Sequence, residues 1–284
     1  FEEEKNFLKV LFRPGYSVQT RELNQLQSIL QDQIGILADF SIPDGSSIIG
    51  GAVNLVSKLP FIKFGTGTSL SRELAEYQGA TFVAANGVEG TIKFMVASES
   101  GNPVTAYVKY DKAAGSVTTP ANSSNVTITF EDTGTEVLTT ATTSATGNGA
   151  GVVMAPGIFY TNKAFVRTDD QLLLLSKYST VIDTDAISIG ITIKDTIVRP
   201  EQDISLLDNA SGTPNQSAPG AHRYKSEVIL VNRADVADAE LQSYKELMKL
   251  EFGKVAARPR LDSDVTVLEQ ILARRTFDQA GDYI

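Results

Sequence analysis

Apolar and polar residues alternate in short runs through the middle of the chain, and these runs are rich in Val, Ile, Thr and aromatic residues. Such runs lie at 91–96, 104–110, 126–130, 158–160, 164–166, 187–193 and 227–231. Alternation with period two, interrupted by frequent turn residues, is typical of half-buried antiparallel strands. The sequence therefore predicts a mainly β protein with flanking helices (α+β), whose β-rich domain spans 40–232 and is antiparallel and β-sandwich-like.

A stretch near 113–151 interrupts this region with many Thr, Ser, Gly and Asn residues. The alternating run at 126–130 inside it indicates a strand rather than a disordered linker. We expect this insertion to form loops and a hairpin at the edge of the β region.

Residues 1–39 predict an arm made of a strand, a turn and a helix. An apolar cluster at 7–12 is followed by Arg13, Pro14 and Gly15, and adjacent proline and glycine mark a turn. Proline fixes φ and glycine permits positive φ, so we interpret these residues as a bend that aims the helix rather than as a ligand site. The helix is expected to begin with Thr20 as its N-cap and to run to about residue 37.

The apolar residues of this helix follow a 3-4 spacing. The candidate interface consists of Leu23, Leu26, Ile29, Leu30, Gln33, Ile34 and Leu37. The stripe is compatible with an amphipathic helix that packs on its own domain and with a short self-associating coiled coil. Two heptads are fewer than the three or four that identify a coiled coil from sequence. We retain the hypothesis that this helix lies at an interface between subunits.

Residues 233–284 return to helical spacing and predict a helical connector. One helix is expected around 241–250, with Gly253 placed to end it. A second is expected from Ser263, with Arg274 and Arg275 in its last turn, where positive charge is favourable. The closing residues resemble the opening of another strand, so we expect the chain to continue beyond residue 284.

Composition excludes several classes of function. Lys and Arg number 25 against 34 Asp and Glu, for a net charge of −9, and an acidic chain of this kind is a poor general binder of nucleic acid. Cysteine is absent, so disulfides, thiolate metal sites and thiol nucleophiles are excluded. No apolar run approaches the ~20 residues of a membrane-spanning helix, so we expect no membrane insertion.

Few residues offer catalytic chemistry. His222 is the single histidine, and it is interpreted as a surface or loop residue. The carboxylate pairs are Asp169 with Asp170, Asp183 with Asp185, and Asp262 with Asp264. Each pair could serve glycoside hydrolysis or ion binding only at a suitable spatial separation, and helix capping or loop solvation is the preferred interpretation of these acids. We therefore expect no enzyme activity, no catalytic residues, no metal and no cofactor.

Three stretches together resemble one family. They are LFRPGYSVQTRELNQLQS at 11–28, the stretch 207–224 with its Arg223-Tyr224 pair, and LARRTFDQAGDY at 272–283. In this order they are similar to a domain of unknown function in structural proteins of tailed bacteriophages, especially cyanophage-like myoviruses, whose members resemble tail-fibre and baseplate-associated proteins. His222 departs from the acidic residue usual at its position, so no charge role is carried over there. The family offers no established catalytic residues.

The resemblance implies a structural virion protein. The leading hypothesis is the baseplate-proximal attachment region of a bacteriophage tail fibre, a homotrimer that docks to baseplate proteins and resides in the virion after synthesis in the host cytoplasm. A baseplate wedge or hub component is the alternative within the same class. A virion-associated glycan-binding or depolymerising enzyme is the alternative of another class, although tryptophan, the preferred sugar-stacking residue, is absent.

Overall fold

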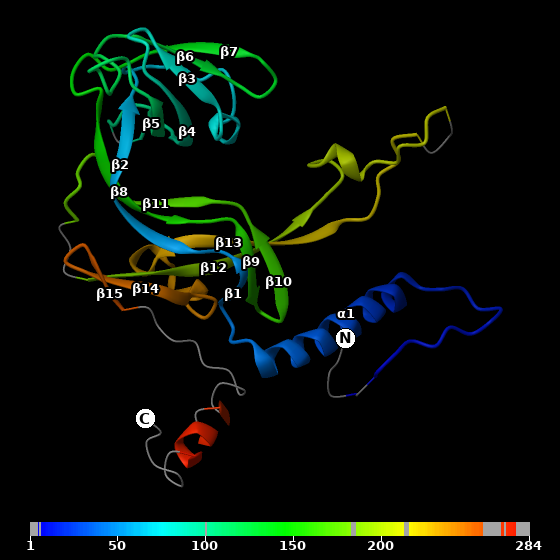
Figure 1. Ribbon diagram of the computed structural model, residues 1–284. Coiled ribbons are helices and arrows are strands. Elements are labelled where there is room, and N and C mark those ends of the chain that lie inside the picture. Colours follow the sequence, from blue (N-terminus) through cyan, green and yellow to red (C-terminus); the bar gives the residue numbers. More distant parts are fainter. Residues whose placement is uncertain are drawn as a thin grey trace. The chain divides into compact units, whose positions relative to one another are not determined.

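The chain forms two compact units in the computed structural model (Figure 1). Residues 5, 7–99, 101–182, 186–212, 216–257, 268–269 and 271–276 are described. The first unit, here called the helical unit, comprises 1–53, 154–171 and 186–284. The second, the barrel unit, comprises 54–153 and 172–185. This division interleaves the units along the sequence, whereas the sequence pattern predicts three consecutive segments, 1–39, 40–232 and 233–284.

The barrel unit is built on an eight-stranded sheet. In chain order its strands are β2 (Val53–Lys63), β3 (Thr81–Ala84), β4 (Glu89–Val96), β5 (Thr105–Lys112), β6 (Asn125–Thr129), β7 (Thr135–Thr139), β8 (Thr146–Met154) and β11 (Gln171–Ser176). The spatial order is β11-β8-β2-β5-β4-β3-β6-β7. A short 3-10 helix, η2 (Leu74–Tyr77), precedes β3.

Six of these strands, β2 to β7, close on themselves. An antiparallel bridge joins Phe64, just after β2, to Thr140, just after β7. On either side of it, Gly65 N donates to Thr139 O at 2.9 Å and Ala141 N donates to Lys63 O at 2.9 Å. The closed barrel leaves neither β2 nor β7 with a free edge at this point, which removes a template for unwanted strand pairing.

The interior of the barrel is filled by one apolar cluster. Every second residue points inward, as with Phe82 and Ala84 of β3 and with Val126 and Ile128 of β6. The cluster consists of Ile62, Phe64, Tyr77, Ala80, Phe82, Ala84, Val88, Ile92, Met95, Val104, Ala106, Val108, Val126, Ile128, Phe130 and Leu138. The Thr-rich insertion thus contributes the expected hairpin, β6–β7, which lies at the end of the sheet order and closes the barrel through the Phe64–Thr140 bridge.

Within its described residues, the helical unit contains one long helix and two small sheets. Helix α1 (Thr20–Ser41) leads into the sheet β1-β9-β10, made of β1 (Ser46–Gly50), β9 (Gly157–Thr161) and β10 (Ala164–Thr168). The second sheet has the order β13-β12-β14-β15. Its strands are β12 (Ala186–Val198), β13 (Arg223–Asn232), β14 (Lys245–Glu251) and β15 (Lys254–Ala257). All its pairings are antiparallel.

Short helical segments complete this unit. Three 3-10 helices lie in its connections: η3 (Ile204–Leu206), η4 (Arg233–Asp235) and η5 (Asp238–Glu240). A short C-terminal helix is described at 268–269 and 271–276, and Arg274 and Arg275 lie within it. The region around Ser263, its expected start, lies outside the described residues.

The prediction of a helix around 241–250 is wrong. This stretch contains β14, which pairs with β12 so that Met248 lies opposite Ile189 and Leu250 opposite Ile187. Both Met248 and Leu250 are buried, as alternation requires, and this burial outweighs the helix propensity of the surrounding Lys, Glu and Leu residues. Gly253 does not end a helix but forms the β14–β15 turn with Phe252, both at positive φ.

The predicted fold class, mainly β with flanking helices, is confirmed, but the region expected to be sandwich-like contains the closed barrel of β2 to β7 instead. The structure is mainly β, its named strands pair antiparallel, and helices stand near both ends of the chain. Every alternating run singled out in the sequence lies in a strand or extends at most one residue beyond it, for example 91–96 in β4 and 187–193 in β12.

Candidate assembly surface

Helix α1 begins at Thr20, and its N-cap lies one residue earlier than expected. Gln19 is the N-cap, and its backbone N–H donates to Glu22 Oε2 at 2.9 Å. A reciprocal contact brings the Gln19 side chain to the backbone of the first turn, so the pair forms a capping box. The Glu22 carboxylate also lies at the positive end of the helix dipole. The helix continues to Ser41, one turn beyond the expected end.

One face of α1 is attached to the β9–β10 hairpin by polar contacts. The Tyr160 hydroxyl donates to the Gly35 carbonyl at 3.0 Å and lies 2.6 Å from Asp39 Oδ1. Lys163 Nζ lies 3.1 Å from Asp32 Oδ1. Residues 32, 35 and 39 fall on one side of a helix with 3.6 residues per turn. This side is therefore held on the hairpin by hydrogen bonds and an ion pair.

Close packing at Gly35 allows these contacts to form. Gly35 is buried, and a Cβ at this position would lie 2.6 Å from Lys163 Cβ. The absence of a side chain lets the helix approach the hairpin turn closely. In that turn, Asn162 and Lys163 both have positive φ, and Asn162 N donates to Asp44 Oδ1 at 3.2 Å.

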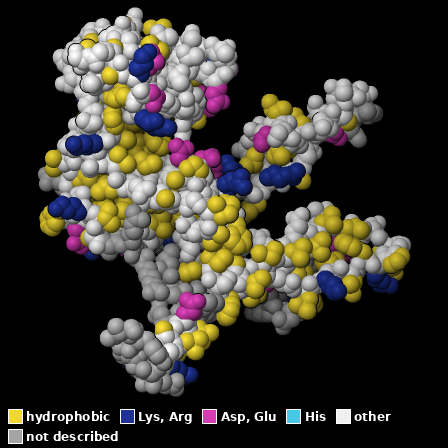
Figure 2. All heavy atoms as spheres, in the orientation of Figure 1, with side chains coloured by type: hydrophobic (Ala, Val, Ile, Leu, Met, Phe, Trp, Pro, Cys, Tyr) yellow, Lys and Arg dark blue, Asp and Glu magenta, His cyan; other side chains and the backbone are white. Residues whose placement is uncertain are grey.

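The opposite face of α1 carries the candidate interface, and most of it is exposed to solvent. Leu23, Leu30, Ile34 and Leu37 are 47%, 53%, 54% and 73% exposed. Gln33 is also exposed and Leu26 is half-buried, whereas Ile29 is buried within the chain. Figure 2 shows hydrophobic side chains gathered over α1 and the segment before it. The structure thus brings the predicted residues onto one stripe, apart from Ile29.

Phe40 belongs to the same stripe and was missed by sequence analysis. It is 56% exposed and lies seven residues after Gln33. With Phe40 the heptad pattern extends over a third repeat, with Leu23, Leu30 and Leu37 at position a. Leu26, Gln33 and Phe40 then occupy position d. The signal was present in the sequence, but the expected helix end at residue 37 excluded it.

The strand expected at 7–12 does not form, and the arm before α1 is an apolar, exposed segment without regular secondary structure there. Phe7, Leu8, Leu11, Phe12, Tyr16 and Val18 are each 48% to 79% exposed. Within the arm, Tyr16 N donates to Arg13 O at 3.3 Å, and Gly15 has φ +81°. Proline second and a positive-φ glycine third are the preferences of a type II turn. The Arg13 guanidinium lies 4.4 Å from the centre of the Tyr16 ring.

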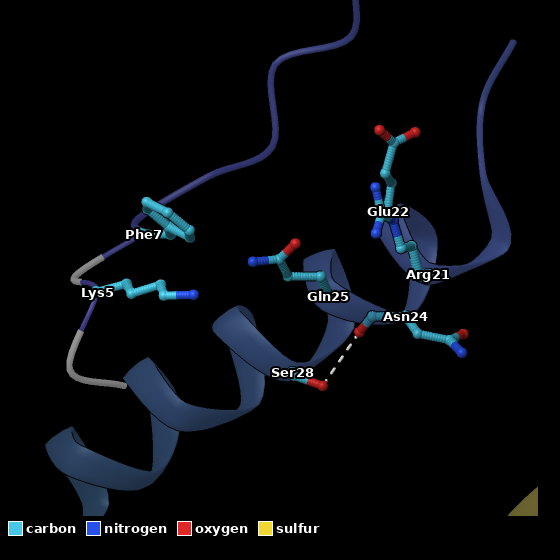
Figure 3. Close-up of a pocket in the computed structure, with 7 residues that line it drawn as sticks. All are labelled: Lys5, Phe7, Arg21, Glu22, Asn24, Gln25 and Ser28. Carbon is cyan, nitrogen blue, oxygen red and sulfur yellow. Dashed lines mark hydrogen bonds between the residues drawn. The ribbon is translucent and has the colours of Figure 1, made fainter. Parts of the chain in front are cut away.

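A shallow hollow lies between the arm and the first turns of α1 (Figure 3). It is lined by Lys5, Phe7, Arg21, Glu22, Asn24, Gln25 and Ser28. Gln25 points toward the arm in this view, and the Ser28 hydroxyl donates to the Asn24 carbonyl at 3.1 Å. The lining mixes amide, hydroxyl and both signs of charge, without a carboxylate cluster or imidazole. Its chemistry is that of a solvated groove beside a helix.

The residues considered for catalysis are not brought together. His222 is exposed in the connection before β13, and Asp169 is exposed beside half-buried Asp170. Asp183, Asp185, Asp262 and Asp264 lie outside the described residues. Over the described part of the chain, no group of three or more His, Cys, Asp or Glu side chains could hold a metal ion.

Comparison with known proteins gives one match. Residues 151–284 match a protein family described as a domain of unknown function (DUF4815). No curated protein and no solved structure matches the chain. Among the described residues, no helix combines the length and apolar character needed to cross a membrane.

Proposed function

We propose that this chain is a structural protein that associates with copies of itself through the exposed stripe of α1. The observation that carries the proposal is the arrangement of the two helix faces. The side with Asp32, Gly35 and Asp39 packs on the chain's own hairpin, while Leu30 and Leu37 face solvent. Burying apolar surface is the main driving force of association, so a helix oriented in this way is suited to a partner.

The chemistry of the stripe favours an identical partner. The stripe and its neighbour Ile34 contain no acidic or basic residue, whereas the chain as a whole has a net charge of −9. Two copies of an acidic protein repel each other over most of their surfaces, and an uncharged face avoids that repulsion. The 3-4 spacing also lets side chains of one helix fit between those of its copy.

We propose a homotrimer as the assembled form, and a virion as its location. This part of the proposal rests on the resemblance of the stretches at 11–28, 207–224 and 272–283 to bacteriophage structural proteins. In that setting the chain is the baseplate-proximal attachment region of a tail fibre, and baseplate proteins are its partners. Its two units supply rigid β structure, and the arm and α1 supply the contact surface.

Quantitative mass spectrometry of purified particles tests this proposal. The chain should be present in multiples of three copies and should cross-link to baseplate proteins. When the Leu30→Asp chain replaces the wild type, it should be absent from the purified particles. The Gln31→Asp chain should be incorporated, because Gln31 is exposed on α1 outside the stripe. A chain absent from purified particles, or the Leu30→Asp chain at normal copy number, would contradict the proposal. Cross-links to the central hub alone would indicate a hub component instead.

A further inference from the structure

The stripe of α1 contains one polar side chain in a core position. Of the six a and d positions, five hold Leu or Phe, and the sixth is Gln33. Gln33 is exposed in the isolated chain, so nothing in the subunit itself requires an amide there. Association through the stripe would remove this amide from water.

We propose that Gln33 aligns the associating helices in parallel and in register. This inference rests on the proposed self-association through α1. A glutamine amide has both donors and an acceptor, so amides at the same level of neighbouring helices can bond to one another. Identical helices place Gln33 at the same level only when they run parallel without a shift. A single polar core residue is a known means of specifying register and oligomeric state at some cost in stability.

Other alignments leave the amide without a partner. If two helices pair antiparallel over the full stripe from Leu23 to Phe40, Gln33 lies at the level of Leu30 on the other helix. A parallel pair shifted by one heptad places Gln33 beside Phe40 or Leu26. In each case a buried amide faces an apolar side chain, and an unsatisfied buried polar group is destabilising. The apolar a and d positions can pack in any of these alignments. Gln33 is therefore the residue that disfavours the antiparallel and shifted alignments.

The absence of cysteine makes this alignment directly measurable. A Leu23→Cys variant of the full 284-residue chain places one thiol near the start of the stripe. Parallel, in-register helices bring equal positions together, so oxidation should join two chains through residue 23. Antiparallel helices would separate these thiols by most of the helix, roughly 25 Å at 1.5 Å per residue.

Removing the amide should relax the alignment while strengthening association. In the Leu23→Cys background, Gln33→Leu should lower the yield of the 23–23 disulfide at least severalfold. Sedimentation should show more than one assembled mass, and the assemblies should persist at lower protein concentration. Gln31→Leu is the matched control, because it makes the same change on the same helix outside the stripe, and it should leave both readings unchanged.

Two results would overturn the inference in distinguishable ways. If the wild-type chain is monomeric, both the proposed function and this inference fail. If the wild-type chain assembles but Gln33→Leu keeps a single mass and an unchanged disulfide yield, self-association stands and the role of Gln33 is wrong.

Discussion

The phenolic oxygen of Tyr160 lies 2.6 Å from Asp39 Oδ1, which connects the middle strand of a three-stranded sheet to the last turns of α1. The same hydroxyl donates to the Gly35 carbonyl at 3.0 Å. Burial of Tyr160, together with the neighbouring Asp39 carboxylate, raises the pKa of the phenol well above its ordinary value. The neutral hydroxyl is therefore a persistent donor that fixes which side of α1 faces the sheet.

Replacing Tyr160 with Phe should loosen this attachment. The variant keeps the ring but removes the one hydroxyl proton that the Asp39 carboxylate and the Gly35 carbonyl share as acceptors. We expect a loss of about 1 to 3 kcal/mol in the free energy of unfolding, measured by urea denaturation, because hydrogen bonds to charged groups fall in this range. Amide exchange over α1 should also accelerate. Tyr16→Phe, at an exposed tyrosine of the arm, should change neither reading.

Gly35→Ala should displace α1 from the hairpin. The new methyl group would lie 2.6 Å from Lys163 Cβ, which is closer than two non-bonded carbon atoms can approach. Overpacking of this kind costs about 1 to 3 kcal/mol, which outweighs the gain in helix propensity from alanine. Thermal unfolding should show the loss, whereas Gln31→Ala, at an exposed residue one turn before Gly35, should be neutral or slightly stabilising. Equal stability of the wild-type and Gly35→Ala chains would show that the close approach is not required.

Tyr110 should make the barrel unit sensitive to alkaline pH. Its hydroxyl is buried without a hydrogen-bond partner among the described residues, and its ring packs edge-on against Phe82 at 6.1 Å between centroids. Burial raises the pKa of Tyr110 to about 12 from 10.0. Below the unfolded-state pKa of about 10, the phenol is neutral in both states and its titration does not affect stability. Between about pH 10 and 12 the phenol ionises more readily in the unfolded chain, so the free energy of unfolding falls as the pH rises.

Tyr110→Phe should remove this sensitivity. Near pH 7 the variant should be as stable as the wild type or more stable by up to about 1 kcal/mol, because an unpaired buried hydroxyl is lost. At about pH 11 its advantage should grow by about 1 kcal/mol, as the ionised phenol favours the unfolded chain only in the wild type. Urea midpoints at the two pH values measure both effects. A constant difference between the two chains would show that Tyr110 does not titrate in this window.

Local patterns were sufficient to predict the first helix and several of the strands, among them β4, β6 and β12. The run 126–130 alternates because one side of β6 fills the barrel, and such alternation is visible in sequence. The segment 245–251 was misassigned because its leucines and methionine also fit a helical period. Only the pairing of Met248 and Leu250 with β12, a contact distant in sequence, decides between the two structures.

The candidate surface was predictable in its residues but not in its setting. The spacing of Leu23, Leu30 and Leu37 is explicit in the sequence, yet it fits packing on the chain's own domain equally well. The deciding contacts come from Tyr160 and Lys163, which lie more than a hundred residues away and bind the other side of the helix. Closure of the barrel through Phe64 and Thr140 likewise depends on a distant pairing that no local pattern reveals.

Sedimentation equilibrium of the full chain tests the central claim, that the stripe of α1 mediates self-association. The wild-type chain should have about three times the monomer mass of 30.5 kDa. The double variant Leu26→Asp/Leu30→Asp should sediment as a folded monomer with an unchanged circular dichroism spectrum, and Gln31→Asp should keep the wild-type mass. A wild-type mass of 30.5 kDa, or an assembled mass retained by the folded double variant, would contradict the account.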